Sequence, residues 1–163
     1  MTRATPLPPL SEDLSLSYRL YPAEGPAKGL LLLLHGVGGN EISMAGLAPL
    51  VPAGFAVALV RSPLSSGPNA FRAFTVNFTP EGPKINAEEA EQSRQRLVRF
   101  VAELQAQVGV TPERTLIAGF SQGGIMASGL GLTSPASVAG FAILSGRILP
   151  EFFPLIAPAE HLG

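Results

Sequence analysis

One serine of the chain stands in a setting that is typical of nucleophilic catalysis. Residues 118–124 read AGFSQGG, so Ser121 lies between Gly119 and Gly123 in the pattern Gly-x-Ser-x-Gly. This pattern marks a serine on a sharp turn from a strand into a helix, where its hydroxyl is exposed near the free N–H groups of the helix. An ordinary glycine-rich turn with a capping serine is the alternative, because the bare motif is short. The apolar run before it and the small-residue helical segment after it favour the nucleophile.

A glycine-rich segment upstream supplies a second part of an acyl-transfer site. Residues 35–40 read HGVGGN and follow an apolar run. The oxyanion of a tetrahedral intermediate needs two backbone N–H donors, one from the residue after the nucleophile and one from a loop after an earlier strand. Gln122 and Val37 occupy these two places. A phosphate-binding loop is the rival interpretation, but the segment lacks both the Gly-x-Gly-x-x-Gly spacing and the Lys-Ser/Thr pair of a P-loop.

Four apolar runs predict the strands that must carry these two motifs. They are apolar on both faces, as strands of a parallel sheet covered by helices are, and they span residues 30–34, 55–60, 114–120 and 138–146. Residues 14–21 alternate apolar and polar side chains and predict a half-buried antiparallel strand. Both motifs follow the carboxyl ends of predicted strands, where α/β sheets bind their ligands. The sequence therefore predicts an α/β fold with a mostly parallel sheet, helices on both faces, and one crevice shared by the motifs.

The predicted helices lie between these strands. The clearest helix begins after Asn86, with Glu89 completing a capping box, and ends at Gly109. Its apolar stripe consists of Ala90, Leu97, Val98, Val101, Leu104 and Val108. Shorter helical segments are expected over residues 43–50 and 122–132.

Composition excludes several classes of function. The net charge is −1 and only 14% of the residues are charged, which gives no electrostatic basis for binding nucleic acid. The arginines at positions 94, 96 and 99 are interleaved with Glu91 and Glu103, and we interpret them as a solvated helix face. The chain has no cysteine, which excludes disulfides, iron–sulfur clusters and thiolate zinc sites.

The length of 163 residues suits one domain. The longest apolar run is too short to span a membrane, and residues 1–17 lack the apolar centre of a signal peptide. We therefore expect a cytoplasmic protein whose proline-rich residues 1–13 are loosely held. The frequent use of Ala, Gly, Leu, Pro and Arg suggests a bacterial source with a GC-rich genome.

Four segments together resemble the bacterial phospholipase/carboxylesterase family of α/β-hydrolases, which includes the acyl-protein thioesterases. They read LLLLHGVGGN, GPNAFRAFTVNF, AGFSQGGIMA and AILSGRILPE, and the resemblance runs over residues 29–151. It implies an α/β-hydrolase fold and hydrolysis of short-chain carboxylic esters or thioesters, without a metal or cofactor. It also implies that Ser121 is the nucleophile and that the backbone N–H groups of Val37 and Gln122 form the oxyanion hole.

Residues 61–85 show no periodicity and are rich in Gly, Pro, Ser and Asn. They predict a long loop that covers or lines the active site, because a loop of this length inside a compact domain usually has a function. The resemblance implies that residues 61–78 border the acyl pocket. The candidate apolar contacts, which are equally ordinary core residues, are Phe71, Phe74 and Phe78.

The triad partners of Ser121 are not evident. The resemblance implies the chain order nucleophile, acid, histidine, so both partners should follow Ser121. Asp13 is the single aspartate and lies far upstream, and His35 belongs to the glycine-rich segment. His161 does follow Ser121, but it lies in a terminal tail with no aspartate between them. We expect a C-terminally truncated hydrolase that lacks its last strands and its triad acid and histidine, with His35 and His161 as alternatives for the base.

The leading hypothesis is a serine carboxylesterase that forms an acyl-enzyme on Ser121. The alternatives are a non-catalytic α/β-hydrolase remnant that binds an acyl ligand or a partner protein, and a thioesterase or depsipeptide hydrolase with an unusual triad. A small-molecule ester is the expected partner, with no nucleic acid and no membrane span. The strand predicted over residues 138–146 is expected to form an exposed sheet edge that pairs with a second copy or with a separate C-terminal fragment.

Overall fold

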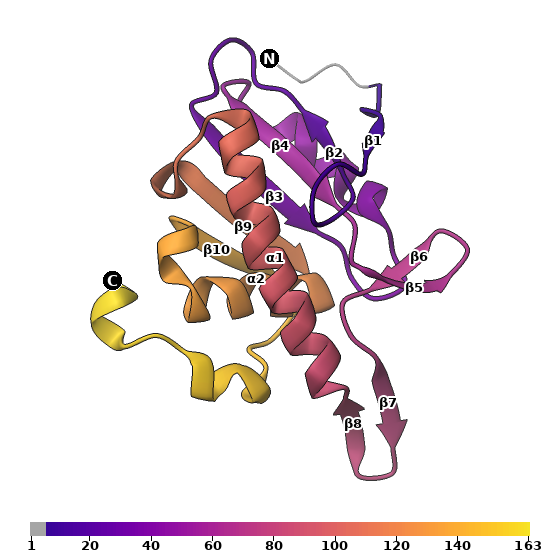
Figure 1. The fold of residues 1–163 in the computed structure, drawn as a ribbon. Coiled ribbons are helices and arrows are strands. Elements are labelled where there is room, and N and C mark those ends of the chain that lie inside the picture. Colours follow the sequence, from indigo (N-terminus) through magenta and orange to yellow (C-terminus); the bar gives the residue numbers. More distant parts are fainter. Residues whose placement is uncertain (1–5) are drawn as a thin grey trace.

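Six strands form the central sheet of the computed structural model, which describes residues 6–163 (Figure 1). Their order across the sheet is β1-β2-β4-β3-β9-β10. The strands are β1 (Leu10–Ser11), β2 (Tyr18–Tyr21), β3 (Gly29–Leu34), β4 (Phe55–Val60), β9 (Thr115–Phe120) and β10 (Gly140–Leu144). β4, β3, β9 and β10 run parallel to one another, whereas β2 pairs antiparallel with β1 and β4. The predicted mostly parallel sheet is therefore confirmed.

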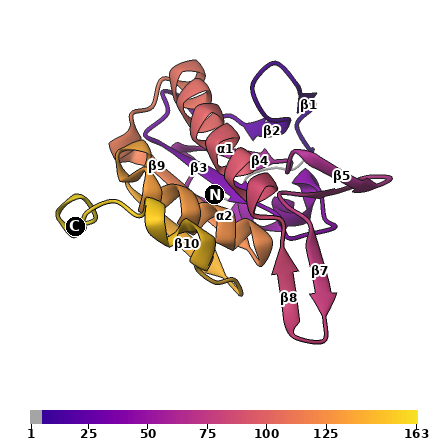
Figure 2. The same cartoon turned by 60° about the horizontal axis from the view of Figure 1, so that its bottom comes forward.

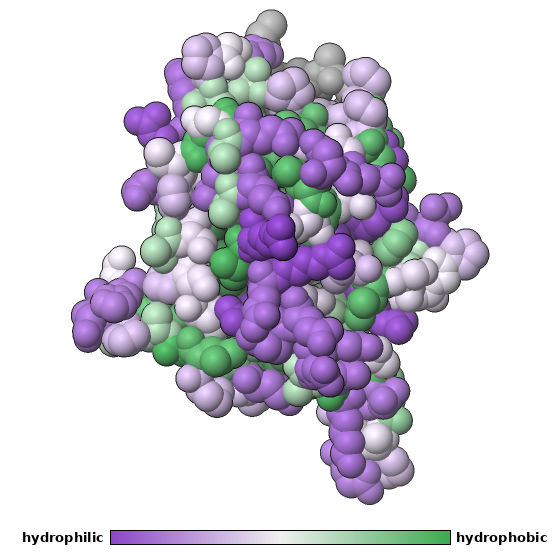
Figure 3. Space-filling model, viewed as in Figure 1, coloured by the Kyte–Doolittle hydropathy of each residue, from purple (hydrophilic) through white to green (hydrophobic). Residues whose placement is uncertain are grey.

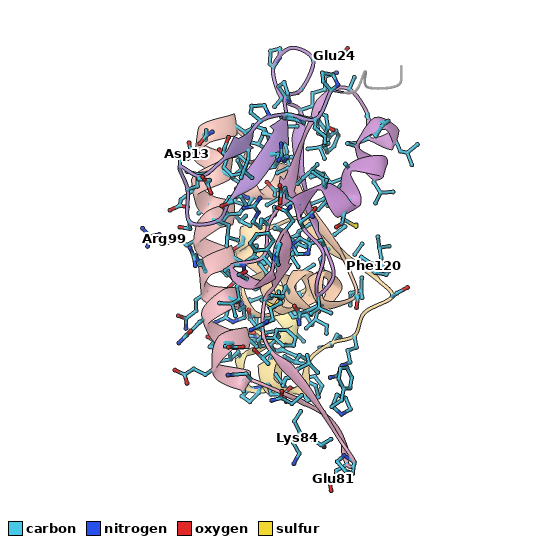
Figure 4. All side chains as sticks on the ribbon, turned by 90° about the vertical axis from the view of Figure 1, so that its right-hand side faces the viewer. Asp13, Glu24, Glu81, Lys84, Arg99 and Phe120 are labelled. Atoms are coloured by element: carbon cyan, nitrogen blue, oxygen red, sulfur yellow. The ribbon has the colours of Figure 1, made fainter. Side chains whose placement is uncertain are left out.

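Helical layers explain why the central strands are apolar on both faces. α1 (Ala87–Val108) lies on one side of the sheet and the 3-10 helix η1 (Glu41–Leu50) on the other (Figure 4). α2 (Gln122–Thr133) packs beside α1. Leu32 of β3 is buried in one cluster with Phe100 of α1, whereas the next residue, Leu33, is buried in a second cluster with Met44 of η1. Successive side chains of β3 thus enter two different cores, and both must be apolar.

α1 begins and ends as predicted, but its N-terminal cap differs in one bond. The Asn86 side chain accepts a hydrogen bond from the Glu89 N–H at 3.1 Å, and Gly109 ends the helix with a φ of 78°. The Asn86 N–H donates to the Thr75 carbonyl at 2.9 Å, and the Glu89 carboxylate accepts from the Thr75 N–H at 2.6 Å. The predicted capping box is therefore wrong in its second bond, because the folded-back chain at Thr75 supplies competing partners.

The two faces of α1 divide as the sequence predicts. Ala90, Leu97, Val101 and Leu104 are buried, and Val98 and Val108 are partly buried against the same core. The opposite face is hydrophilic (Figure 3). There Arg99 is 77% exposed and pairs with Glu103 at 3.2 Å, as on a solvated helix face. The prediction is wrong for Arg94, which is 12% exposed, pairs with Glu91 at 2.7 Å and donates to Thr133 Oγ1 of α2 at 2.8 Å.

Residues 61–85 form two short antiparallel hairpins in place of the predicted long loop. Their strands are β5 (Leu64–Gly67), β6 (Ala70–Arg72), β7 (Val76–Thr79) and β8 (Gly82–Ile85). A glycine at positive φ adjoins each turn, Gly67 at the end of β5 and Gly82 at the start of β8. The β7–β8 hairpin projects away from the body (Figures 1 and 2). A projecting hairpin has no face buried against a core, so the period-two pattern that identifies strands in a sequence is absent.

The two ends of the described chain lie against the same domain body. Leu10 and Ser11 form β1, so the prediction of loosely held residues 1–13 is wrong at these two positions, and residues 1–5 lie outside the described part. After β10 the chain returns along α2, where a Cβ added at Gly129 would lie 2.5 Å from the Phe152 ring. The remaining short 3-10 helices are η2 (Pro112–Arg114), η3 (Pro135–Ser137), η4 (Pro150–Leu155) and η5 (Ala159–His161).

Within residues 6–163, none of the helices combines the length and apolar character that crossing a membrane requires.

β10 forms one edge of the sheet, and the face of β9 and β10 opposite α2 is open. Leu116 is 42% exposed, Phe120 47% and Leu144 40%. A groove of about 470 Å³ lies beside them, bounded by Met44 and Leu47 of η1. Among residues 6–163, no element covers this apolar half of the sheet face.

Candidate active site

Ser121 lies on a sharp turn between β9 and α2. Its φ of 54° and ψ of −117° are sparsely populated for a residue with a side chain, and such strain is found mainly at functional sites. A Cβ added at Gly119 would lie 2.1 Å from the Gly123 carbonyl carbon, and one at Gly123 would lie 2.2 Å from the Leu34 oxygen. The Ser121 N–H donates to the Leu144 carbonyl at 2.8 Å, which ties the turn to β10. Neither flanking glycine can therefore carry a side chain while the turn keeps this shape.

The glycine-rich segment after β3 lies directly beside this turn. A Cβ added at Gly36 would lie 3.4 Å from the Ser121 Cβ. Gln122 is the first residue of α2, and the N–H groups of a helix's first turn have no acceptor within the helix. The structure thus brings together the two segments that the sequence predicts to converge.

Two of the amides in this segment already have partners. The Gly38 N–H donates to the Phe71 carbonyl at 2.8 Å, and the Gly39 N–H donates to the Gly36 carbonyl at 3.1 Å. The Phe71 N–H in turn donates to the Gly39 carbonyl at 2.8 Å, so β6 is bonded to this segment. Val37, which is 54% exposed, is the residue whose amide the sequence assigns to the oxyanion. Because the Gly38 and Gly39 amides are already hydrogen-bonded, they are not available to an oxyanion, which is consistent with the assignment of Val37.

His35 is part of the scaffold beneath this segment. Its side chain is 1% exposed, Nδ1 lies 2.7 Å from the Gly36 carbonyl oxygen, and the Ser62 N–H donates to Nε2 at 3.0 Å. These contacts require the neutral tautomer that carries its proton on Nδ1, because Nε2 must accept. Burial lowers the pKa of the imidazole, which favours the same neutral form. Both ring nitrogens are engaged with the backbone, so His35 is not placed to take a proton from Ser121.

The other two candidate triad residues lie elsewhere. His161 is in η5 and borders a groove with Gly131 and Leu132, near the C-terminal end of α2. α2 has 12 residues, so that end is roughly 18 Å from the end that carries Ser121. Asp13 accepts a hydrogen bond from the Tyr18 hydroxyl at 3.1 Å and lies on the far side of the molecule from Phe120, the neighbour of Ser121 (Figure 4). The structure brings neither residue to the nucleophile.

The three candidate pocket phenylalanines occupy three different environments. Phe74 is 1% exposed and belongs to the main core, whereas Phe78 is 86% exposed on the projecting hairpin. Phe71 is half-buried, and the Arg61 guanidinium lies 4.4 Å from the centre of its ring. Contact of Phe71 or Phe78 with a substrate stays a prediction, and Phe74 has no free surface to offer.

Sequence reasoning missed a buried charge cluster under this region. Glu41 is 4% exposed and accepts hydrogen bonds from Arg61 at 2.8 and 3.0 Å and from Arg19 at 3.1 Å. Burial alone would raise the pKa of Glu41, but the guanidinium groups outweigh it and lower the pKa to about 2. An acidic residue at the start of a mostly apolar helical segment was the available signal. The cluster supports the site, since Arg61 also stacks on Phe71.

A mostly parallel sheet between helical layers, with a strained serine turn from β9 into α2, defines an α/β-hydrolase. The chain belongs to the phospholipase/carboxylesterase family, whose sequence profile matches residues 18–153. The esterase YpfH of Escherichia coli is 32% identical over 133 residues, which cover 77% of this chain and 56% of that protein. Acyl-protein thioesterase 1 of Kluyveromyces lactis is 28% identical over 149 residues, which cover 83% and 65%.

Solved structures agree with this assignment. A carboxylesterase from Mesorhizobium loti superposes with a TM-score of 0.76 at 25% identity, and the match covers 86% of this chain and 66% of that one. The chain therefore spans between half and two thirds of the length of each of these three relatives.

Proposed function

We propose that this chain carries the nucleophile and oxyanion hole of a serine carboxylesterase acting on short-chain carboxylic esters or thioesters. The Ser121 Oγ attacks the carbonyl carbon, its proton passes to a base, and the carbonyl oxygen becomes an oxyanion. The N–H groups of Val37 and Gln122 stabilise that oxyanion. Collapse of the intermediate expels the alcohol or thiol, and water then hydrolyses the acyl-enzyme.

The observation that carries this proposal is the strained backbone of Ser121 between two glycines that tolerate no side chain. An ordinary helix cap needs neither feature, because a capping serine adopts an extended conformation and bonds back to the helix. The Ser121 side chain makes no capping hydrogen bond. The names of the relatives, an esterase and an acyl-protein thioesterase, support the same class of substrate.

The base comes, in this proposal, from an imidazole outside these 163 residues. The chain has two histidines. The first is held by the backbone on both ring nitrogens, and the second lies near the far end of α2. Without a base the serine is weakly activated, so we expect the chain by itself to react slowly at Ser121.

Labelling with a fluorophosphonate tests the assignment. The reagent phosphonylates activated serines, and intact mass followed by peptide mapping should place the adduct on Ser121. Ser121→Ala should remove the adduct and any hydrolysis of p-nitrophenyl acetate. Ser134→Ala is the matched control, because Ser134 terminates the same helix at its other end, and it should label as the wild type does. Ester hydrolysis that survives Ser121→Ala would falsify the nucleophile assignment.

A non-catalytic α/β-hydrolase that binds an acyl ligand or a partner protein is the second candidate. The observation that favours it is that neither histidine is placed to act on Ser121, since the ring nitrogens of His35 are bonded to the backbone and His161 lies near the far end of α2. The labelling experiment separates the two candidates. Saturating reagent that leaves Ser121 unmodified over many hours supports the binding protein, whereas a slow stoichiometric adduct supports the enzyme.

We further propose that β10 pairs with an additional strand, from a second copy of the chain or from a separate polypeptide. Support comes from its edge position and from the exposed apolar side chains of its own Leu144 and of Phe120 on the neighbouring β9. Native mass spectrometry at micromolar concentration should show a dimer or a complex. A clean monomer of 16.9 kDa would contradict this pairing.

A further inference from the structure

The side chain of Gln122 makes contacts that its role as a backbone donor does not explain. It is 4% exposed. Its Oε1 accepts a hydrogen bond from the Ala73 N–H at 2.8 Å, and its Nε2 donates to the Phe74 carbonyl at 3.0 Å. One carboxamide thereby satisfies a donor and an acceptor on adjacent residues of the backbone. The residue next to the nucleophile is thus tied to a segment nearly fifty positions earlier in the chain.

That segment is bonded in turn to the glycine-rich segment that carries Val37. Phe71 lies two residues before Ala73, and it exchanges two hydrogen bonds of 2.8 Å with Gly38 and Gly39. A continuous series of hydrogen bonds and short backbone steps therefore links the Gln122 side chain to the residues that follow Val37. The two amides assigned to the oxyanion hole stand at the two ends of this series.

Further contacts hold the intermediate segment in place. The Ser93 hydroxyl of α1 donates to the Ala73 carbonyl at 2.5 Å, and the Arg61 guanidinium covers the Phe71 ring. These groups anchor the segment to the body of the protein. Gln122 adds a direct bond between this segment and the turn that carries Ser121, which the other contacts do not provide.

We propose that the Gln122 side chain is a positioning residue that sets the distance between the two halves of the oxyanion hole. It acts through residues 71–74 and touches no substrate, whereas its own N–H is one of the two donors. The catalytic consequence of this role rests on the proposed function, whereas the structural coupling between Gln122 and the glycine-rich segment does not depend on it. Removing the carboxamide leaves the Ala73 N–H and the Phe74 carbonyl unpaired in a buried place, and the segment loosens to rehydrate them. The Val37 amide then loses its fixed position relative to Ser121.

Gln122→Met tests the coupling, because methionine keeps the volume and removes both hydrogen-bonding atoms. Amide hydrogen exchange followed by NMR should show at least tenfold lower protection at Gly38, Phe71 and Ala73. Gln105→Met is the matched control. Gln105 is another buried glutamine, 8% exposed, whose Nε2 donates to Thr115 Oγ1 and to the Ser137 carbonyl at the other end of the domain. The control should lower overall stability without changing protection at those three amides.

The catalytic consequence has its own measurement. Fluorophosphonate labelling at Ser121 should slow about ten- to a hundredfold in Gln122→Met, since a misplaced oxyanion donor has an effect of this order. The control variant should label at the wild-type rate. Should the methionine variant fail to fold, the isosteric Gln122→Glu carries the test. When ionised, its carboxylate keeps the Ala73 bond and loses the donor to Phe74, whereas the protonated form keeps both. Because burial disfavours the ionised form, protection at Gly38 and Phe71 should match the wild type at low pH and fall as the pH is raised and the glutamate ionises.

The outcomes decide separately on the structural coupling, on the positioning role and on the proposed function. Unchanged exchange at Gly38 and Phe71 in Gln122→Met overturns the coupling, and equal loosening in the Gln105 variant reduces it to a general loss of stability. Loosened exchange with an unchanged labelling rate overturns the positioning role. Absence of labelling in the wild type counts against the proposed function alone, because the exchange measurements still decide the coupling.

Discussion

Replacing Gly123 by alanine tests whether the serine turn needs its close approach to β3. The added Cβ would lie 2.2 Å from the Leu34 oxygen and 2.6 Å from the His35 oxygen. Ordinary contacts begin near 3.4 Å, so the turn and β3 must separate by about 1 Å. Both obstructing atoms belong to the backbone, at the last residue of the central strand β3 and at the residue that follows it, and neither can rotate away as a side chain would.

The magnitude follows from this displacement. Overpacking of a core destabilises by about 1–3 kcal/mol, and a rigid obstruction places Gly123→Ala at the upper end. For a domain of this size a loss of about 3 kcal/mol lowers the melting temperature by roughly 6–12 °C. Displacing a nucleophile by about 1 Å slows its reaction on the order of a hundredfold. Labelling of Ser121 should therefore slow by that factor at a temperature where the variant is still folded.

Two other glycines provide a graded comparison. A Cβ at Gly46 would meet nothing within 4 Å, so Gly46→Ala should leave stability and labelling unchanged or slightly improved. A Cβ at Gly36 would lie 3.2 Å from the Phe120 ring and 3.4 Å from the Ser121 Cβ. The stability and labelling rate of Gly36→Ala should therefore lie between those of Gly46→Ala and Gly123→Ala. Urea unfolding and fluorophosphonate labelling rank the three variants by stability and by the reactivity of Ser121. A Gly123→Ala protein with wild-type stability and labelling would refute the steric argument.

Three further predictions concern charge, packing and the second histidine. The folded pKa of Glu41 is lowered from 4.5 to about 2, so its ion pairs contribute stability above pH 4.5 that is lost as the pH falls toward 2. In the wild type this loss should amount to about 1–2 kcal/mol of unfolding free energy after solvent screening. Glu41→Gln should remove this pH dependence, as measured by urea unfolding at a series of pH values. Phe74→Ala should destabilise the fold by about 3–5 kcal/mol, whereas Phe78→Ser should change stability by less than about 0.5 kcal/mol; equal effects in thermal unfolding would contradict their assigned environments. His161→Ala should leave the rate of labelling at Ser121 unchanged, and a slower rate would restore this histidine as a candidate base.

Features that depend on near neighbours were predicted well from the sequence. The run at residues 55–60 matches β4 at both ends, because a strand covered on both faces must be apolar throughout. Asn86 and Gly109 mark the ends of α1, since capping and left-handed backbone are local requirements. The turn at Ser121 follows from two glycines. The steric reason for Gly119 lies within five residues, at Gly123, whereas that for Gly123 lies at Leu34 and His35 and only the tertiary structure shows it.

Contacts between distant segments were not predicted. Nothing in the sequence pairs Glu41 with Arg19 and Arg61, because the strand order that brings β2, β4 and η1 together is not a local property. The two hairpins between residues 61 and 85 were missed for another reason: their strands pair with near neighbours in the chain, but they lack the buried apolar face that gives a strand its period-two pattern.

The sequence by itself therefore determined the parallel sheet, and it predicted the serine turn and the two amides assigned to the oxyanion. The sheet depends on the periodicity of apolar residues, and the other two on motifs a few residues long. Only the tertiary structure decided how the two halves of the site are held to one another. The Gln122 carboxamide meets Ala73 and Phe74, and Phe71 meets the glycine-rich segment, because sheet order and helix packing place these groups within hydrogen-bonding distance. The same packing engages both ring nitrogens of His35 with the backbone and places His161 near the far end of α2, which the spacing of residues along the chain does not determine.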